Sequence, residues 1–398
     1  MVNDDVYDEL KSHWGLDSDY IFLNHGSFGA TPNKVLDEQS ALRRRLESQP
    51  IRFFERELPG LQEAAKSRVG AFLGVDGSDL AFVANATTGV NTVLRSLKFT
   101  RDDEILVTEF AYGACRNAVD FVAARSGASV RVAATPFPGS SKDALKDSIF
   151  DAVGSRTRIV LLDHITSPTG LVFPLAEIVP ELESMGVECL VDGAHAPGMV
   201  SLNIGELGAS YYVGNLHKWV CAPKGAAILH VRADRQEAIR PLVISHGATY
   251  IDPERTRFEL EFEWQGTDDP TAFLCAPAAL DFMGGLMPGG WTELMDSNRE
   301  KVLKGRAILC EALQIDEAAD RGLIGSLAAI SLPQGFGGFD NSLEGALQLH
   351  NSLHVDDAIE VPVIYWPGQK SLIVRISAQA YNAFRDYERL GEALIRRR

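Results

Sequence analysis

Short apolar runs and longer amphipathic segments alternate through the first two thirds of the chain. The apolar runs predict strands at 80–84, 104–108, 129–132, 158–162, 189–191, 211–213 and 225–231. Apolar positions at helical spacing predict helices at 35–46, 61–72, 114–126, 142–153 and 175–185. Regular alternation of strands and helices predicts an α/β fold, with a mostly parallel sheet of the seven-stranded type and helices on both of its faces.

The remaining segments suggest how the chain is divided. Residues 271–398 contain helical patterns near 271–285 and 298–312 and strand patterns at 327–332 and 372–376, which predict a small α+β domain. We expect residues 71–270 to form the large domain and residues 1–70 to pack with the small one. Pro50 and Pro59 bracket a predicted linker between two helices.

Between 245 and 269 the periodicity is lost, as it is in active-site and interface loops. We therefore expect no regular element in this stretch.

Composition and charge exclude several classes of protein. With 45% hydrophobic and 23% charged residues the chain is typical of a globular enzyme. A net charge of −16 argues against a nucleic-acid partner, because phosphate binding needs clustered Lys and Arg. No apolar run approaches a membrane span of about 20 residues, and the acidic start at 2–5 lacks the features of a signal peptide. We expect a cytoplasmic protein with no membrane partner.

The five cysteines stand at 115, 189, 221, 275 and 310, an odd number without CxxC spacing. This pattern favours reduced thiols over disulfides, and it indicates no metal site.

Asp192 and Lys218 follow two of the predicted strands, and the ends of strands are where α/β proteins place their chemistry. Pyridoxal phosphate needs a lysine amine to hold its aldehyde as a Schiff base, and a carboxylate to keep its ring nitrogen protonated. Lys218 and Asp192 supply both groups, while the alternative is a surface lysine beside a salt-bridged aspartate. His195 could pack on the cofactor ring or bond Asp192, and His217 directly precedes the lysine.

Two further features fit the same cofactor and an amino-acid substrate. Ala86, Thr87 and Thr88 open a predicted helix, where free N–H groups, the helix dipole and hydroxyl donors favour phosphate; the alternative is simple N-capping by a threonine. Arg375 is a lone arginine in an apolar strand, and its guanidinium suits a substrate carboxylate. The alternative is a core arginine paired with an acid for structural reasons.

Several motifs carry a resemblance to a known family. V-D-G-A-H-A-P-G at 191–198, followed by G-N-L-H-K-W at 214–219, resembles the class V aminotransferase superfamily of fold-type I pyridoxal phosphate enzymes. N-H-G-S-F-G-A-T-P at 24–32, R-F-F-E-R-E-L-P at 52–59 and H-I-T-S-P-T-G-L-V-F-P at 164–174 resemble its isopenicillin N epimerase-like branch. The resemblance runs from about Tyr20 to Arg375 and implies a homodimer with its two sites at the subunit boundary.

The resemblance implies roles for more residues of the cofactor site. Tyr112 stands where the superfamily places a ring that stacks on the cofactor; an interface or core tyrosine is the alternative. Asn215 is a candidate cofactor contact because it belongs to the G-N-L-H-K-W motif that contains the lysine. Related enzymes hold an asparagine near Ser167 to bond the cofactor phenol oxygen, and here Thr166, Ser167 or neither takes that role.

The same resemblance concerns the substrate and the second subunit. The segment with Asn24 and His25 borders the substrate site in the family, so both are candidate contacts, although an ordinary turn is the alternative. Gly266 and Thr267 resemble the segment that reaches the partner subunit's phosphate; a surface turn is the alternative.

The reaction stays open at this stage. We expect an external aldimine with an amino acid and cleavage of a bond at its α carbon: β-elimination as a C–S lyase, or decarboxylative deamination, of a cysteine S-conjugate in secondary metabolism such as antibiotic biosynthesis. Amino-acid epimerisation is the alternative and transamination a weaker one. Cysteine desulfurases of the superfamily carry their sulfur-accepting cysteine on a loop shortly before the carboxylate-binding arginine. Here no cysteine follows Cys310, which disfavours persulfide transfer. A cofactor-sensing domain of a transcription regulator is disfavoured by the acidic charge and the short stretch before Tyr20.

Overall fold

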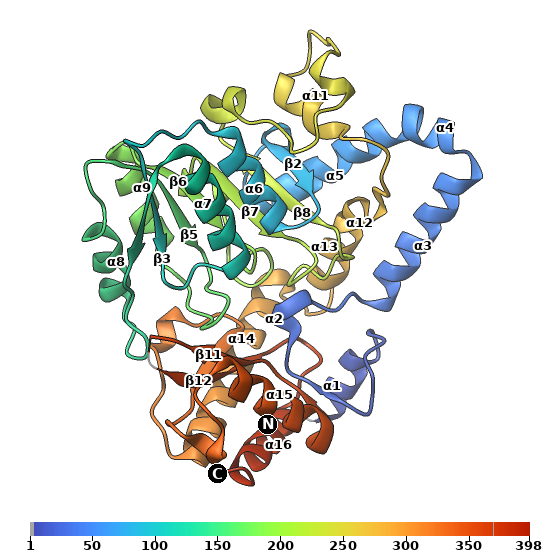
Figure 1. Cartoon of the computed structure of the whole chain (residues 1–398). Helices are drawn as coiled ribbons and strands as arrows, with labels where there is room; N and C mark the ends of the chain where they lie inside the picture. Colours follow the sequence, from blue (N-terminus) through green and yellow to red (C-terminus); the bar gives the residue numbers. More distant parts are fainter. Residues whose placement is uncertain (1–3, 369) are drawn as a thin grey trace.

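The computed structural model describes residues 4–368 and 370–398. It has two parts, a large one built around the main sheet and a smaller one around the second sheet, which lies below the first in Figure 1. Within the described residues, no helix combines the length and the apolar character that a membrane crossing requires.

The main sheet has seven strands in the order β2-β8-β7-β6-β5-β3-β4. Their bounds are Leu80–Val83, Ala227–Val231, Tyr211–Asn215, Glu188–Asp192, Thr157–Asp163, Glu104–Thr108 and Ser129–Ala133, in that order. The five strands from β7 to β4 are parallel, whereas β8 is antiparallel to both β2 and β7. The predicted mostly parallel α/β fold is therefore confirmed, with β8 inside the sheet and β2 at its edge.

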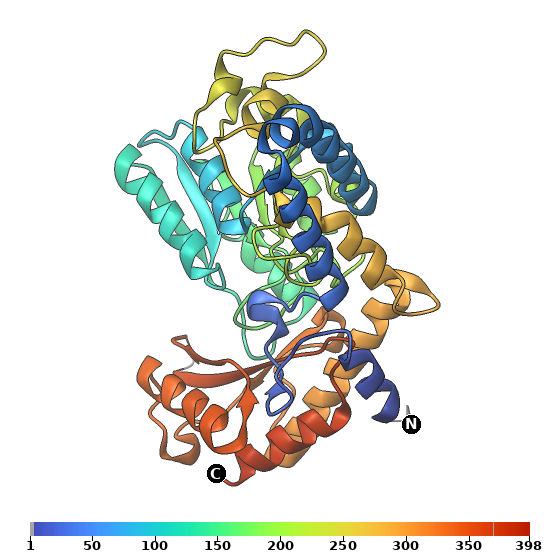
Figure 2. The ribbon, with the colours of Figure 1, turned by 90° about the vertical axis from the view of Figure 1, so that its right-hand side faces the viewer.

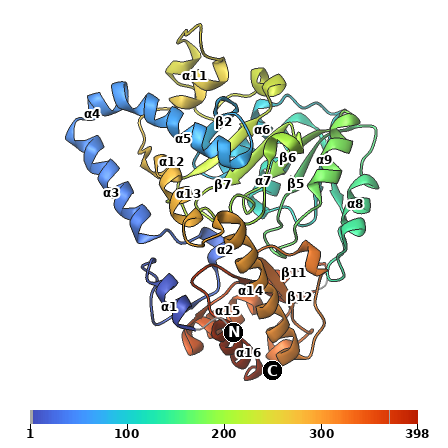
Figure 3. The ribbon, with the colours of Figure 1, turned by 180° about the vertical axis from the view of Figure 1, so that it is seen from behind.

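Both faces of the sheet are covered because side chains alternate along each strand. Ile105 and Val107 pack under α6 (Ala86–Ser96) and α7 (Gly113–Ser126), which lie in front of the sheet in Figure 1. Leu106 belongs to the opposite core, which α9 (Leu175–Ser184) and α13 (Ala276–Gly284) cover. Figure 3 shows this second face from behind. Burying each such aliphatic side chain contributes about 1.5–3 kcal/mol.

Other helices complete the large part at its margins. They are α8 (Lys142–Phe150), α10 (Ile204–Leu207), α11 (Arg257–Glu263) and α12 (Thr271–Leu274). The expectation that 245–269 is irregular is wrong at α11. There Thr256 and Glu259 form a capping box, which begins a helix too short to show a period in the sequence.

The N-terminal helices form a helical arm that bends at Gln49, where the backbone leaves the helical conformation (Figure 1). It comprises α3 (Asn33–Ser48), α4 (Pro50–Arg52), the π-helical turn η1 (Phe53–Glu57) and α5 (Leu58–Leu73). The predicted linker between Pro50 and Pro59 is wrong, because both prolines occupy first-turn positions, where a helix needs no N–H from them.

The arm runs along the side of the large part in Figure 2, where α3 and α5 contact α12 and α13. The domain boundaries at 70 and 270 stay a prediction.

The smaller part is an antiparallel sheet in the order β11-β12-β9 (Val363–Trp366, Ser371–Ser377 and Leu327–Ser331). Its helices are α14 (Gly290–Leu313), α15 (Leu343–Asp357) and α16 (Phe384–Ile395). The N-terminal residues join it: β1 (Ile21–Phe22) pairs in parallel with β10 (Ile359–Glu360), and α1 (Asp4–Lys11) lies beside α16. The short helix α2 (His25–Phe28) then leads back to the large part.

Candidate active site

A cavity of about 560 Å³ opens where β5, β6 and β7 end and α6 begins. Ten of the residues predicted for the site line it together: Ala86, Thr87, Thr88, Tyr112, Ser167, Asp192, His195, Asn215, His217 and Lys218. The carboxyl ends of parallel strands meet at one edge of the sheet, which explains why segments so distant in the sequence converge.

Lys218 follows β7 on a turn and directs its amine into the cavity. Its Nζ donates to Nε2 of His195 over 3.1 Å. Burial lowers the pKa of Lys218 to about 8, the charge of Arg375 acts in the same direction, and Asp192 opposes the shift. Burial also holds the pKa of His195 well below its usual value, so the ring is neutral and its Nε2 can accept from the ammonium group of Lys218.

Asp192 is the last residue of β6, and both of its oxygens accept hydrogen bonds. One takes the N–H of Ala194 at 3.0 Å and the other the thiol of Cys115 at 3.1 Å. Asp163, the last residue of β5, lies beside it in register. Burial, followed by the charge of Asp192, raises the pKa of the Asp163 carboxyl well above its usual range, which favours its protonated form.

The start of α6 faces the cavity and is fixed by two asparagines. Asn85 is the N-cap and accepts from the backbone N–H of Thr88 at 2.8 Å, so N-capping by a threonine is not the role of these residues. The N–H of Ala86 donates to Oδ1 of Asn215 at 2.8 Å. Asn215 therefore orients the helix start, whose dipole favours an anion in the cavity.

Arg375 lies in β12 and is 4% exposed. Its guanidinium donates to the backbone oxygen of Ser167 at 2.5 Å and to the hydroxyl of Ser27 at 2.9 Å, with Asn24 at 3.4 Å. Burial lowers the pKa of Arg375 to about 10. All of its hydrogen bonds in the described structure go to neutral oxygens, which leaves a buried cation that a ligand carboxylate would match.

Asn24 and His25, which were both predicted to border the substrate site, lie in different surroundings. Asn24 bonds Glu360 at 2.8 Å and Arg375, so it stays close to the guanidinium. His25 does not line the cavity: its ring is fully buried behind the backbone of Lys218 and bonds the carbonyl oxygen of that residue at 2.9 Å.

Tyr112 is 47% exposed and lies on the cavity wall, which excludes a role in the core. Thr166 is fully buried, with its hydroxyl 2.6 Å from that of Thr169, whereas Ser167 lines the cavity. Of these two, only Ser167 can reach a ligand there.

Some lining residues were not predicted. Lys224 follows Lys218 by six residues and burial lowers the pKa of its amine; the P-K-G sequence at 223–225 was its only signal. Asp163 was present in the strand before the quoted motif, and Ser27 and Phe28 were present in the N-terminal motif. The sequence predicted no role for these residues, because the residues that surround them in the cavity are distant in the chain.

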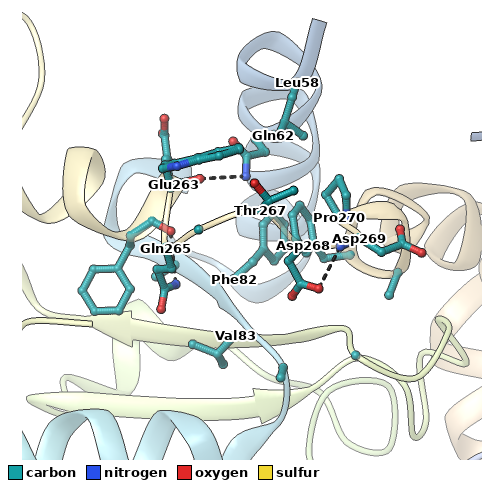
Figure 4. A pocket seen from close by; sticks show the side chains of 18 of the residues that line it. Leu58, Gln62, Phe82, Val83, Glu263, Gln265, Thr267, Asp268, Asp269 and Pro270 are labelled. Carbon is teal, nitrogen blue, oxygen red and sulfur yellow. Dashed lines mark hydrogen bonds between the residues drawn. The ribbon is translucent and has the colours of Figure 1, made fainter. Parts of the chain in front are cut away.

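Thr267 lines a second cavity, of about 570 Å³, which adjoins the first and shares Thr88 and Lys224 with it (Figure 4). Figure 4 shows Thr267 near Gln62 of α5 and above Phe82 of β2. On this wall Gln62 donates to the backbone oxygen of Glu263. In a single chain, Thr267 is thus a neighbour of the first cavity and not part of its wall.

Comparison with known proteins identifies the family of the chain. The family model described as aminotransferase class-V matches residues 22–299. Isopenicillin N epimerase of Amycolatopsis lactamdurans is 33% identical over 95% of this chain and 95% of its own. L-cysteine desulfhydrase of Arabidopsis thaliana is 28% identical over 99% of this chain and 90% of its own.

A solved structure of the cystine C-S lyase C-DES, in complex with cysteine persulfide, has a TM-score of 0.78 at 21% identity. The match covers 95% of this chain and 98% of that one. At this identity the likeness shows the fold.

Proposed function

The chain belongs to the class V aminotransferase family and is a pyridoxal 5′-phosphate enzyme, and we propose that it cleaves the C–S bond of cysteine or of a cysteine S-conjugate by β-elimination. The proposal is supported by the identity to a cysteine desulfhydrase over nearly the whole chain and by the groups that line the cavity.

The lining residues fit this cofactor. Lys218 offers the amine for its aldehyde, Asp192 a carboxylate for its ring nitrogen, and the start of α6 with Thr87 a place for its phosphate. Nδ1 of His195 is buried without a partner in the described structure, as expected of a group that meets a ligand. When bound, pyridoxal phosphate supplies an electron sink that weakens the bonds to the substrate's α carbon.

The protein's own groups then bind the substrate and move protons. Arg375 binds the substrate carboxylate and gains the counter-charge that its present partners do not supply. The neutral amine of Lys218 takes the α proton and then delivers it to the departing sulfur, while His195 keeps that amine in place. For cysteine, the Cα–H and Cβ–S bonds break, sulfide leaves, and hydrolysis gives pyruvate and ammonia, so no oxidant or reductant is needed.

The observation that carries the proposal is the position of the thiols. All five cysteines are buried and none lines the cavity, so no enzyme thiol stands ready to accept sulfur as a persulfide. Burial raises the pKa of the Cys115 thiol, which bonds Asp192 from behind the cavity wall, and this makes it a poor nucleophile. Sulfur is therefore expected to leave the site as sulfide or as a free thiol.

The test compares products directly. Purified protein is incubated with L-cysteine, an S-alkyl cysteine and its sulfoxide, and pyruvate, ammonia, thiol and carbon dioxide are measured. Lys218→Ala is the matched control. Carbon dioxide release would indicate decarboxylative deamination instead. Deuterium incorporation at Cα with inversion and no pyruvate would identify the alternative, an epimerase, which the 33% identity to isopenicillin N epimerase favours.

We further propose a cytoplasmic homodimer in which Thr267 of each chain completes the partner's phosphate site. The proposal rests on the family resemblance of Gly266 and Thr267, and in its own chain Thr267 lies on the wall of the second cavity, outside the first. The five unpaired cysteines favour a reducing compartment. Mixing Lys218→Ala with a Thr267→Trp protein should restore activity, because one site of each heterodimer then has a sound lysine and a sound loop. Subunit exchange without recovered activity would contradict the shared site.

A further inference from the structure

The backbone turn that carries Lys218 is unusually constrained. The N–H of Cys221 donates to the carbonyl oxygen of Lys218 at 3.1 Å, and Cys221 has φ 61°, which residues with side chains rarely adopt. Two glycines allow the backbone on either side to approach: a Cβ at Gly198 would lie 2.8 Å from the carbonyl carbon of Trp219, and one at Gly29 would lie 2.9 Å from Cα of Lys218. The position of the catalytic amine depends on this turn.

His25 of α2 contacts the turn directly. Its Nε2 lies 2.9 Å from the carbonyl oxygen of Lys218, and its ring centroid lies 4.9 Å from that of Trp219. Its Nδ1 lies 2.8 Å from the hydroxyl of Tyr381, and its backbone N–H donates to Oγ of Ser377 at 2.8 Å. The side chain is fully buried, so solvent does not compete for these bonds.

The proton of the ring can be assigned from these partners. Burial lowers the pKa of His25 to about 3, so the ring is neutral and has a single N–H. A carbonyl oxygen can only accept, so this N–H is on Nε2 and points at Lys218. Nδ1 then accepts from Tyr381, whose pKa burial raises well above its usual value, so the hydroxyl remains a donor.

The amide of Gln379 lies farther from Nε2, at 3.4 Å, and has the sulfur of Cys221 at 3.7 Å as an acceptor. The shorter contact with the carbonyl oxygen decides which atom carries the proton.

We propose that His25 is a positioning residue for Lys218: its one N–H, whose direction Tyr381 fixes, holds the carbonyl oxygen of Lys218 and so keeps the amine beside His195. This inference rests on the proposed role of Lys218 as the amine that bonds the cofactor. The sequence suggested His25 as a substrate contact, and the structure gives it a different task.

The segment around His25 also connects the two halves of the site. Ser27, two residues later, accepts from Arg375, and Ser377, which takes the N–H of His25, lies two residues after Arg375 on β12. One short helix therefore contacts both the backbone of the catalytic lysine and the strand of the carboxylate-binding arginine.

Two variants distinguish the contribution of the Nε2 N–H of His25 from that of its ring. His25→Gln places an amide N–H near the position of Nε2, whereas His25→Asn reaches only the position of Nδ1; both remove the ring from Trp219. The full-length proteins are stripped of cofactor and mixed briefly with pyridoxal phosphate. Borohydride then fixes the lysine adduct, and mass spectrometry gives the yield at Lys218 relative to that at Lys224, an internal reference on the same cavity wall.

We expect His25→Asn to slow labelling of Lys218 about tenfold and His25→Gln to stay within about threefold of wild type, because a lost hydrogen bond of about 1.4 kcal/mol corresponds to a factor of ten. Wild-type labelling in His25→Asn, or equal slowing in both variants, would overturn the proposal.

Tyr381→Phe is the second variant, chosen because it keeps the aromatic ring if His25→Asn fails to fold. It should slow labelling about fivefold, beyond the range expected for His25→Gln, through loss of the bond that orients His25. Wild-type labelling in this variant would also overturn the proposal. The assay uses no amino-acid substrate, so its failure can be told apart from a failure to find C–S lyase activity.

Discussion

The amine of Lys218 should titrate near pH 8 in cofactor-free protein. Burial is the largest cause of its lowered pKa. With a pKa of about 8, about 9% of the amine is neutral at pH 7, against about 0.03% for an exposed lysine with a pKa of 10.5. The site thus raises the amount of reactive amine at neutral pH by about 300-fold, which is what attack on an aldehyde requires.

Two substitutions move this titration in opposite directions. Arg375→Gln removes a positive charge and should raise the midpoint, while Asp192→Asn removes a negative charge and should lower it. The assay is the pH dependence of the labelling rate of Lys218 with a small amine-reactive reagent, read by mass spectrometry. A wild-type midpoint near pH 10, or shifts of the same sign in both variants, would refute the reasoning.

The same pKa has a consequence for stability. The unfolded chain holds the Lys218 proton up to about pH 10.5, whereas the folded protein releases it near pH 8. Between these values the unfolded state binds more protons, so the cofactor-free protein should gain stability as the pH rises through this window. The free energy of unfolding, measured in denaturant at several pH values against Lys218→Ala, tests the sign.

Three further predictions follow from individual contacts. Gly29→Ala should lower the free energy of unfolding by about 2–4 kcal/mol, because Gly29 has φ 69° and an added Cβ would collide with the carbonyl oxygen of His217; Gly113→Ala, where the space is open, is the control in the same denaturant assay. Cys115→Ala should weaken cofactor binding about threefold to tenfold, read by equilibrium titration, because Asp192 loses a hydrogen bond; unchanged affinity would argue against that support. Asp192→Ala should retain some cofactor but lose turnover, and near wild-type turnover would contradict its role as partner of the ring nitrogen.

Local patterns in the sequence were sufficient for the large part of the fold and the centre of its site. Asp192 and Lys218 could be predicted because each follows an apolar run, and strand ends converge in an α/β sheet. In the smaller part, α15 was missed because the exposed Leu343 and Leu347 obscure the apolar face that its buried residues Ala346, Leu349 and Leu353 form.

The environment of Arg375 and the place of His25 depend on contacts between the two ends of the chain. Asn24 and Glu360, which bond each other, are 336 positions apart. No local sequence pattern can indicate which side of the short segment with Asn24 and His25 faces β12, because the two are so far apart in the chain. The motif around His25 indicated its importance, while only the structure distinguishes a wall of the cavity from a support behind the lysine.

The pairing of β1 with β10 constrains the order in which the protein can fold during its synthesis. The groups proposed for the cofactor, from Thr87 to Lys218, leave the ribosome long before β12 is made. The segment from Ile21 to Ser27 must wait for β10 and β12 before it can find its partners. Because contacts so distant in sequence form slowly, a nascent chain would pass through a stage with a nearly complete cofactor pocket and no substrate pocket. Early capture of pyridoxal phosphate at that stage would favour the folded large part before the last strands are synthesised.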